Sequence, residues 1–255
     1  MGDAKKLIVK PISSKDANRI IKRLHYSGKV VPNSQLHFGV FLDGKCGGAM
    51  QFGPSMRKDL IRPLVSDTGW NEFLELNRMA FADWLPRNGE SRCIGYSMRY
   101  IKKHYPHIEW VISFADGCQC GDGTIYRASG FLLTSVKKNS TIIKLTDGSI
   151  ASNITFSKGR HILSSGGAKM PEGAKRLAGF QLRYIYFLDP TAKDRLTVPV
   201  LPFSKIDEMG AGMYKGKQRI QKRASSDTID TPDVQSGKGG VIPTDALHSS
   251  EDGDE

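Results

Sequence analysis

The spacing of apolar residues along the chain predicts an alternation of strands and helices. Between Ser14 and Gly28 apolar residues recur every three or four positions, which is typical of a helix. Two runs of strand character, Leu36–Leu42 and Lys45–Phe52, flank the turn Asp43-Gly44 and predict a β-hairpin. The first part of the chain is therefore expected to contain a helix followed by antiparallel strands.

The stretch Pro86–Phe131 carries the clearest pattern. A polar turn leads into a helical repeat that Pro106 stops, and a run of β-branched and aromatic residues, Ile108–Ala115, then predicts a buried strand. The strand ends at Asp116-Gly117, before a glycine-rich loop and a short helix. Ligands of such units bind at the carboxyl ends of strands, so we expect chemistry near Asp116.

The remaining pattern defines the predicted domain organisation. A strand is expected over Glu72–Ala82, and further strands are expected at Leu132–Val136, Thr141–Leu145, Ile150–Phe156, His161–Leu163 and Leu182–Leu188. From Lys205 onward the apolar residues no longer follow the period of a strand or a helix. We therefore predict one α/β (α+β) domain over residues 1–204, a basic segment over 205–223 and a disordered acidic tail over 224–255, which has no Phe, Trp or Tyr.

The element order is that of the Gcn5-related N-acetyltransferase fold, in which a mixed sheet splays open around an acyl-coenzyme A.

Charge is distributed unevenly. The net charge is +11, and the tail from residue 224 holds eight acidic residues against one lysine, so positions 1–223 carry +18. A body this basic favours a polyanionic partner, with nucleic acid first, over a merely soluble basic surface. The candidate DNA contacts are Arg57, Lys58, Arg62, Lys215, Lys217 and Arg219.

The chain has no apolar run long enough to predict a membrane span and no signal-peptide pattern at its start, so we expect a cytoplasmic protein. The cysteines, Cys46, Cys93, Cys118 and Cys120, are spaced irregularly and do not predict a disulfide framework. Cys118 and Cys120 can bind a metal in principle, but without a second pair a tight loop with free thiols is favoured.

Four titratable side chains are candidate catalytic residues. His25 and Tyr26 lie at a predicted helix end, Asp116 follows a buried strand, and Tyr126 begins the next helix. These groups can move protons, and an imidazole and a carboxylate can also ligate a metal. The structural alternatives are a capping histidine, tyrosines packed against the sheet, and an Asx turn at Asp116.

Anion binding is expected at the start of the helix after Pro86. Asn88, Gly89, Ser91 and Arg92 can bind a phosphate of a donor or of DNA, because the amide groups at a helix start attract anions. The sequence lacks the Arg/Gln-x-x-Gly-x-Gly/Ala signature of acyl-coenzyme A enzymes in register. The missing signature argues against an ordinary coenzyme A site, so the donor is left open between acetyl-coenzyme A and another activated molecule.

Six segments together resemble the Mom DNA-modification family of bacteriophages. They are His25–Ser27, Leu76–Phe81, Asn88–Ser91, Ser113–Gly117, Gly123–Phe131 and Arg183–Pro190. The resemblance implies an acetyltransferase-like fold and an enzyme that converts adenine in double-stranded DNA to N6-carbamoylmethyladenine, which protects phage DNA from restriction in the host cytoplasm. It also implies that His25, Tyr26, Asp116 and Tyr126 lie in the active site, with iron at His25 and Asp116.

Two other functions remain open on the sequence. An ordinary acyl-coenzyme A N-acetyltransferase needs a coenzyme A site, and a non-catalytic DNA-binding module has no need for His25, Tyr26 and Asp116 to converge. A structure that places these three within about 5 Å of one another in a cleft favours an enzyme.

Overall fold

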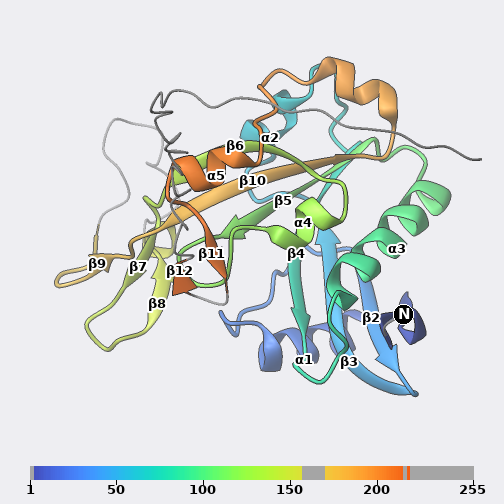
Figure 1. Ribbon diagram of the computed structural model, residues 1–255, viewed down its shortest axis with the longest axis horizontal. Coiled ribbons are helices and arrows are strands. Elements are labelled where there is room, and N and C mark those ends of the chain that lie inside the picture. Colours follow the sequence, from blue (N-terminus) through green and yellow to red (C-terminus); the bar gives the residue numbers. More distant parts are fainter. Residues whose placement is uncertain (1–2, 157–169, 215–216, 219–255) are drawn as a thin grey trace, which may run out of the picture. The chain divides into compact units, whose positions relative to one another are not determined.

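Seven strands form the main sheet, in the order β1-β2-β3-β4-β5-β10-β6 (Figure 1). They are β1 (Ile8–Pro11), β2 (Leu36–Leu42), β3 (Lys45–Gly53), β4 (Phe73–Phe81), β5 (Trp110–Asp116), β6 (Leu132–Lys138) and β10 (Phe180–Phe187). Neighbouring strands are antiparallel except β4 and β5, which are parallel. The structure, a computed structural model, describes residues 3–156, 170–214 and 217–218, all within the compact unit Met1–Gln221.

The parallel pair splays open after three residues. Phe73–Glu75 of β4 pairs with Trp110–Ile112 of β5, and the two strands make no further pairs. Asn77 is an extra residue in β4, because Phe52 of β3 pairs with Leu76 while Gln51 pairs with Arg78. Such a bulge bends and twists its strand, in keeping with the divergence of β4 from β5. The prediction of a mixed, splayed sheet is confirmed.

Smaller elements surround this sheet. The helices are α1 (Ser14–Leu24), α2 (Lys58–Ile61), α3 (Gly89–His104), α4 (Thr124–Ala128) and α5 (Ser204–Glu208), with 3-10 turns at Asp3–Lys6, Arg62–Leu64, Asn153–Phe156 and Pro190–Arg195. A second sheet has the order β8-β7-β9 and consists of β7 (Ile142–Lys144), β8 (Ile150–Ser152) and β9 (Lys175–Arg176). A hairpin of β11 (Met213–Tyr214) and β12 (Lys217–Gln218) follows α5.

Helices α1 and α3 cover opposite faces of the sheet. Ile94 and Met98 of α3 are buried in the largest apolar cluster, against which Met79 of β4 packs. Ile21 of α1 is buried with Ala80, the next residue of β4. Because successive strand residues point to opposite faces, the two helices lie on opposite sides of β4.

Local signals explain the ends of α1. The Ser13 hydroxyl accepts a hydrogen bond from the Asp16 amide at 3.1 Å, so Ser13 is the N-cap of the helix. At the other end the His25 amide donates to the Ile21 carbonyl at 2.9 Å, and Gly28 adopts a positive φ of 59°. Glycine tolerates this left-handed conformation, which turns the chain away after His25 and Tyr26.

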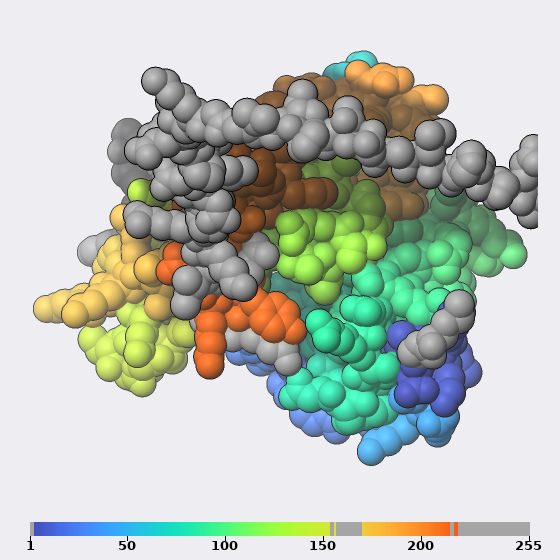
Figure 2. All heavy atoms as spheres, in the orientation of Figure 1, coloured from blue at the N-terminus to red at the C-terminus, as the bar shows by residue number. Residues whose placement is uncertain are grey.

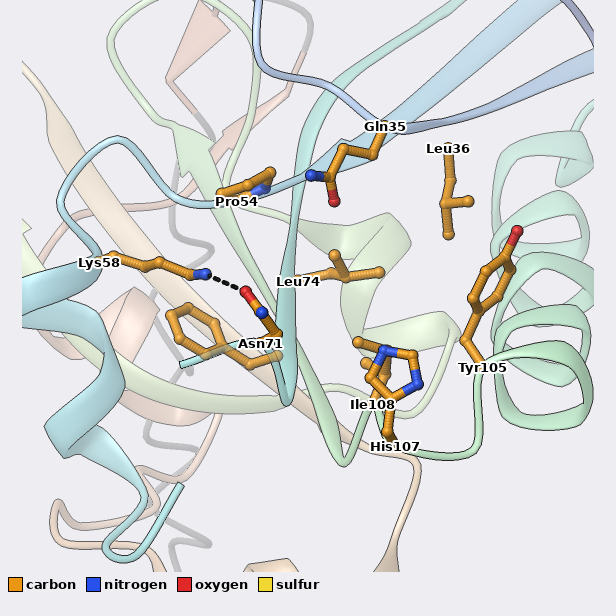
Figure 3. A pocket seen from close by; sticks show the side chains of 10 residues that line it. Gln35, Leu36, Pro54, Lys58, Asn71, Leu74, Tyr105, His107 and Ile108 are labelled. Carbon is orange, nitrogen blue, oxygen red and sulfur yellow. Dashed lines mark hydrogen bonds between the residues drawn. The ribbon is translucent and has the colours of Figure 1, made fainter. Parts of the chain in front are cut away.

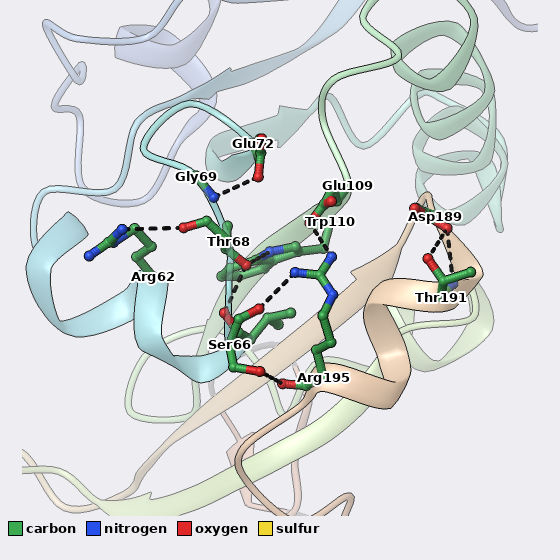
Figure 4. A network of polar contacts seen from close by, with 11 residues as sticks. Arg62, Ser66, Thr68, Gly69, Glu72, Glu109, Trp110, Asp189, Thr191 and Arg195 are labelled. Carbon is green, nitrogen blue, oxygen red and sulfur yellow. Dashed lines mark hydrogen bonds and ion pairs between the residues drawn. The ribbon is translucent and has the colours of Figure 1, made fainter.

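A polar network fixes the irregular segment before β4 to the start of β5 (Figure 4). The Trp110 indole donates to the Thr68 hydroxyl at 3.1 Å, and that hydroxyl donates to the Val65 carbonyl at 2.8 Å. Arg195 pairs with Glu109 at 2.6 Å. These bonds anchor the parallel end of β4 and β5 while their other ends diverge.

Four expectations differ from the structure or fall outside the described residues. The expected strand Ile150–Phe156 is β8 followed by a 3-10 turn. No regular element was expected after residue 204, but α5 forms there and buries Ile206 in the main core. The sequence did not indicate this helix, because five residues are too few to show a helical period. The expected strand His161–Leu163 and the tail 224–255 lie outside the described residues. Among the residues that are described, no helix is both long enough and apolar enough to cross a bilayer.

Candidate active site

A cavity of about 640 Å³ lies where β4 and β5 diverge. It is lined by Leu24, His25, Tyr26, Glu75, Leu76, Asn77, Arg78, Met79, Ala80, Phe81, Glu90, Phe114, Ala115, Asp116, Gln119, Cys120, Gly121, Asp122, Gly123, Thr124, Ile125, Tyr126, Ile142, Gln181, Met213 and Tyr214. The lining comes from both edges of the gap, from the end of α1 on one face and from α4 on the other. The cavity therefore connects the two faces of the sheet.

Tyr26 and Asp116 meet in this cavity although 90 residues separate them. The Tyr26 hydroxyl donates to Asp116 Oδ2 at 3.3 Å, and the Tyr26 ring stacks on the His25 ring with centroids 4.3 Å apart. The structure thus brings His25, Tyr26 and Asp116 together in a cleft. A module that only binds DNA has no need of this arrangement.

The hydrogen bonds of His25 define its tautomer. Its Nδ1 accepts from the Ser27 amide at 3.2 Å and lies 2.8 Å from the Ser27 hydroxyl. An amide can only donate, so Nδ1 is unprotonated and the proton of the neutral ring is on Nε2. Burial, followed by the positive charge of Arg78, lowers the pKa of His25 to about 4 despite the opposing effect of Asp116. At neutral pH His25 is an uncharged hydrogen-bond donor.

Asp116 is both a turn former and a cavity carboxylate. Its Oδ1 accepts from the Cys118 amide at 2.9 Å, which closes an Asx turn, and its Oδ2 accepts from Gln119 Nε2 at 2.8 Å and from Tyr26. The alternatives considered for Asp116 from the sequence are therefore compatible. One oxygen holds the loop and the other faces the neighbouring donors.

The surroundings of Asp116 keep its neighbours protonated. Partial burial and then the Asp116 carboxylate raise the pKa of the Tyr26 phenol. Burial and Asp116 also raise the pKa values of Cys118 and Cys120 to about 12. The phenol and the two thiols remain neutral at physiological pH, so Asp116 is better suited than Tyr26 to accept a proton.

Tyr126 lines the cavity from α4, on the other face of the sheet. Its ring is buried and packs against Phe131 and Tyr184 at centroid distances of 5.5 and 5.3 Å. Burial raises the pKa of its phenol, an effect that the nearby Ser113 hydroxyl opposes. Tyr126 thus keeps its phenolic proton and can donate a hydrogen bond within the cavity.

The predicted anion-binding residues lie at the start of α3. Asn88 has a positive φ of 65° and precedes the helix, Gly89 is buried, and Arg92 is exposed. The Gly89 amide already donates to the Pro86 carbonyl at 3.0 Å. In the first turn of α3 the residue that lines the cavity is Glu90. A carboxylate at this point repels a diphosphate, so the turn fits coenzyme A only in part.

Comparison with known proteins decides the family. The model of a family described as the Mom protein family matches residues 6–205. The chain belongs to the Mom family. The methylcarbamoylase mom of Escherichia phage Mu is 37% identical over 212 residues, which cover 79% of this chain and 85% of that protein. The resemblance predicted from six short segments is confirmed.

Solved acetyltransferases align with this Mom family chain at low identity. The IAA acetyltransferase from Bacillus cereus has a TM-score of 0.42 and 11% identity, over 71% of this chain and 99% of that chain. The ribosomal-protein-S18-alanine N-acetyltransferase from Escherichia coli has a TM-score of 0.41 and 12% identity, over 72% of this chain and 94% of that chain. The α/β fold itself is defined by the strand order and the splayed pair described above.

Glu75 and Arg78 are among the charged cavity residues that the sequence analysis did not single out. Glu75 is the last residue of β4 that pairs with β5, and burial raises the pKa of its carboxyl. Arg78 donates to the Lys29 carbonyl at 3.2 Å and to the Asn77 carbonyl at 2.7 Å. A carboxylate inside the apolar run of β4 was the available signal for Glu75, because such groups are rarely buried without a reason.

Iron does not fit the residues present. In the parts of the chain that the structure describes, no group of three or more His, Cys, Asp or Glu residues is placed to hold a metal ion. His25 Nδ1 accepts from the Ser27 amide and Nε2 carries the ring proton, so neither nitrogen has a free lone pair for a metal in this arrangement. Both oxygens of Asp116 already accept hydrogen bonds. The predicted iron site at His25 and Asp116 is therefore not supported.

The predicted DNA contacts in the α2 region make bonds within the chain. Arg57 pairs with Asp59 at 3.0 Å, and Arg62 donates to the Thr68 carbonyl at 3.3 Å. Lys58 donates to Asn71 at 3.0 Å and lines a separate cavity of about 470 Å³ at the start of β4 (Figure 3). Lys217 is exposed on β12, whereas Lys215 and Arg219 lie outside the described residues.

Proposed function

We propose that this chain is a phage DNA-modification enzyme that converts adenine in duplex DNA to N6-carbamoylmethyladenine and so protects DNA from restriction. The observation that carries the proposal is the contact between Tyr26 and Asp116 in the cavity of a Mom family chain. The relative from phage Mu is named a methylcarbamoylase, and this name supports the transfer of a small group that contains a carbamoyl unit.

The target adenine must leave the duplex, because its N6 amine is paired inside the base stack. Flipping a base costs a few kcal/mol, which pocket contacts must offset. The cavity supports this step because its volume, about 640 Å³, is typical of small-ligand sites. Two aromatic side chains that remain 52% and 42% exposed, Tyr26 and Phe114, line it and are available for stacking on the base.

Asp116 is the proposed general base. Transfer forms a bond between adenine N6 and the CH2 of a carbamoylmethyl donor, and the bond from that carbon to its leaving group breaks with its electron pair. The proton of N6 passes to Asp116 and then to the leaving group. The N6 lone pair is delocalised into the ring, so removal of the proton as the bond forms lowers the barrier.

Protonated donors complete the proposed site. His25 carries its proton on Nε2 and Tyr126 retains its phenolic proton, so each can donate a hydrogen bond to a developing negative charge. The donor is an activated small molecule that carries a carbamoylmethyl group. Coenzyme A takes no part in the proposed step, because the first turn of α3 places Glu90 at the cavity.

The nature of the product tests the proposal. The chain is expressed in a bacterium without restriction systems, and plasmid DNA is digested to nucleosides and analysed by mass spectrometry. We expect deoxyadenosine that carries a carbamoylmethyl group. An acetylated base would indicate an acyltransferase instead, and unmodified DNA from cells that contain the folded protein would refute the proposed activity.

A further inference from the structure

Exposed basic side chains gather on the strands beside the cavity. Lys137 and Lys138 end β6, Lys144 ends β7, and Lys175 and Arg176 form β9. All five are exposed, and no ion pair joins any of them to another described residue. Figure 2 shows this yellow-green and yellow region at one side of the molecule, next to the orange β11–β12 hairpin. The hairpin contributes Tyr214 to the cavity lining.

Strand register places Lys137 in line with the candidate base. Gln181 of β10 pairs directly with Asp116 on one side and with Lys137 on the other. Residues directly opposite each other in antiparallel strands share a face, and strands lie about 4.8 Å apart. Asp116 and Gln181 both line the cavity, so Lys137 continues the same row, with its backbone roughly 10 Å from that of Asp116.

A second row begins at Ile142, which lines the cavity from β7. Lys144 lies two residues further on, and therefore on the same face at a spacing of about 6.6 Å. Lys175 pairs directly with Lys144 and shares that face. The Gln181 amide donates to the Thr141 hydroxyl at 3.2 Å, which ties this small sheet to the row in the main sheet.

The other two basic residues lie on the reverse faces. Lys138 pairs with Phe180, which packs against the main core on the side of α3. Arg176 pairs with Ile143, which is fully buried. Lys138 and Arg176 are thus basic and exposed on the same strands as Lys137 and Lys175. They differ from these two lysines and from Lys144 in the direction of their side chains.

The geometry points to Lys137, Lys144 and Lys175 as the surface that holds the DNA backbone beside the flipped adenine. This inference rests on the proposed function for the identity of the polyanion. A flipped base needs its flanking phosphates held next to the pocket, and lysines act there as point charges that do not read sequence. The basic residues of the α2 region, by contrast, are engaged with Asp59, Asn71 and Thr68.

The test compares two double variants of the full chain in binding to a duplex oligonucleotide at several salt concentrations. K137Q/K144Q removes two charges from the cavity side, and K138Q/R176Q removes two from the reverse faces. Each lost phosphate contact lowers the slope of log affinity against log salt by about 0.9. When salt rises fourfold, the factor by which K137Q/K144Q loses affinity should therefore be about ten times smaller than the factor for the parent chain. K138Q/R176Q should lose affinity by the same factor as the parent.

Equal slopes for the two variants would overturn the assignment. K137R/K144R keeps the charge and should retain the parent slope, which separates lost contacts from misfolding. Nucleoside analysis of the parent chain keeps the two proposals apart. If the parent chain modifies adenine but K137Q/K144Q and K138Q/R176Q bind DNA with the same salt dependence, only the assignment of the lysine surface is refuted. A parent that binds DNA through these lysines but leaves adenine unmodified refutes the proposed reaction alone.

Discussion

Replacing Asp116 with Asn separates the two roles of this side chain. The amide oxygen of Asn can still accept from the Cys118 amide, the 2.9 Å bond that closes the Asx turn. The amide nitrogen takes the position of Oδ2, which accepts from Gln119 at 2.8 Å and from Tyr26 at 3.3 Å. The loop keeps its shape, while the negative charge and one acceptor disappear.

The expected effects on stability and on activity differ in size. A net hydrogen bond to a charged group contributes about 1.5–3 kcal/mol, but the Gln119 amide can turn its oxygen toward the new NH2 group and recover much of that. We expect the free energy of unfolding to fall by about 1 kcal/mol, or roughly 2–4 °C in a chain of this size. Removal of a general base should lower the rate by about 10²–10⁴.

Thermal unfolding and plasmid nucleoside analysis measure the two effects side by side. Gln119→Ala is the matched control, because it removes a hydrogen bond to Oδ2 but leaves the carboxylate. We expect modified adenine from Gln119→Ala and almost none from Asp116→Asn. Full modification by the Asp116→Asn protein would show that Asp116 is only a turn former and would refute its role as base.

Three further substitutions test neighbouring features. Tyr26→Phe removes the donor to Asp116 and should lower modification with little loss of DNA affinity; unchanged modification would exclude a role for the hydroxyl. The folded pKa of His25, about 4, lies below its ordinary 6.5, so the unfolded chain binds more protons and stability should fall as pH drops from about 6.5 to about 4, by at most about 3 kcal/mol. His25→Asn should flatten that part of the curve measured by denaturant unfolding, and an unaltered curve would contradict the buried neutral ring. Thr68→Val leaves the buried Trp110 indole without its acceptor and should lower the free energy of unfolding by about 1–3 kcal/mol; an unchanged melting temperature would show that the network in Figure 4 adds nothing.

Glycines, prolines and apolar periods made much of the fold predictable. The helix that ends at His25, the strand that ends at Asp116 and the helix stopped before Pro106 are all local signals, and each lies close to its predicted position. The candidate residues at these ends were therefore found without long-range information. A helix of only five residues, such as α5, is too short to show a repeated period and carries no such signal.

Long-range pairing could not be predicted. Nothing local to β4 indicates that its pairing with β5 stops at Glu75, or that Asn77 is an extra residue against β3. Charge alone also could not distinguish Arg57 and Arg62, which make bonds within the chain, from Lys137, which continues a row of cavity residues. Their partners depend on strand register and on loops that only the folded chain brings together.

The splay of β4 and β5 explains why the candidate chemistry gathers where it does. A continuous sheet would separate the end of α1 from α4 by a layer of paired backbone. Because pairing ends at Glu75 and Ile112, Tyr26 reaches Asp116 on one face while Tyr126 lines the same cavity from the other. A carboxylate that can accept a proton and a phenol that retains one are thereby exposed to a single space. The interrupted strand pair is thus the structural feature that allows groups from opposite faces to line one cavity.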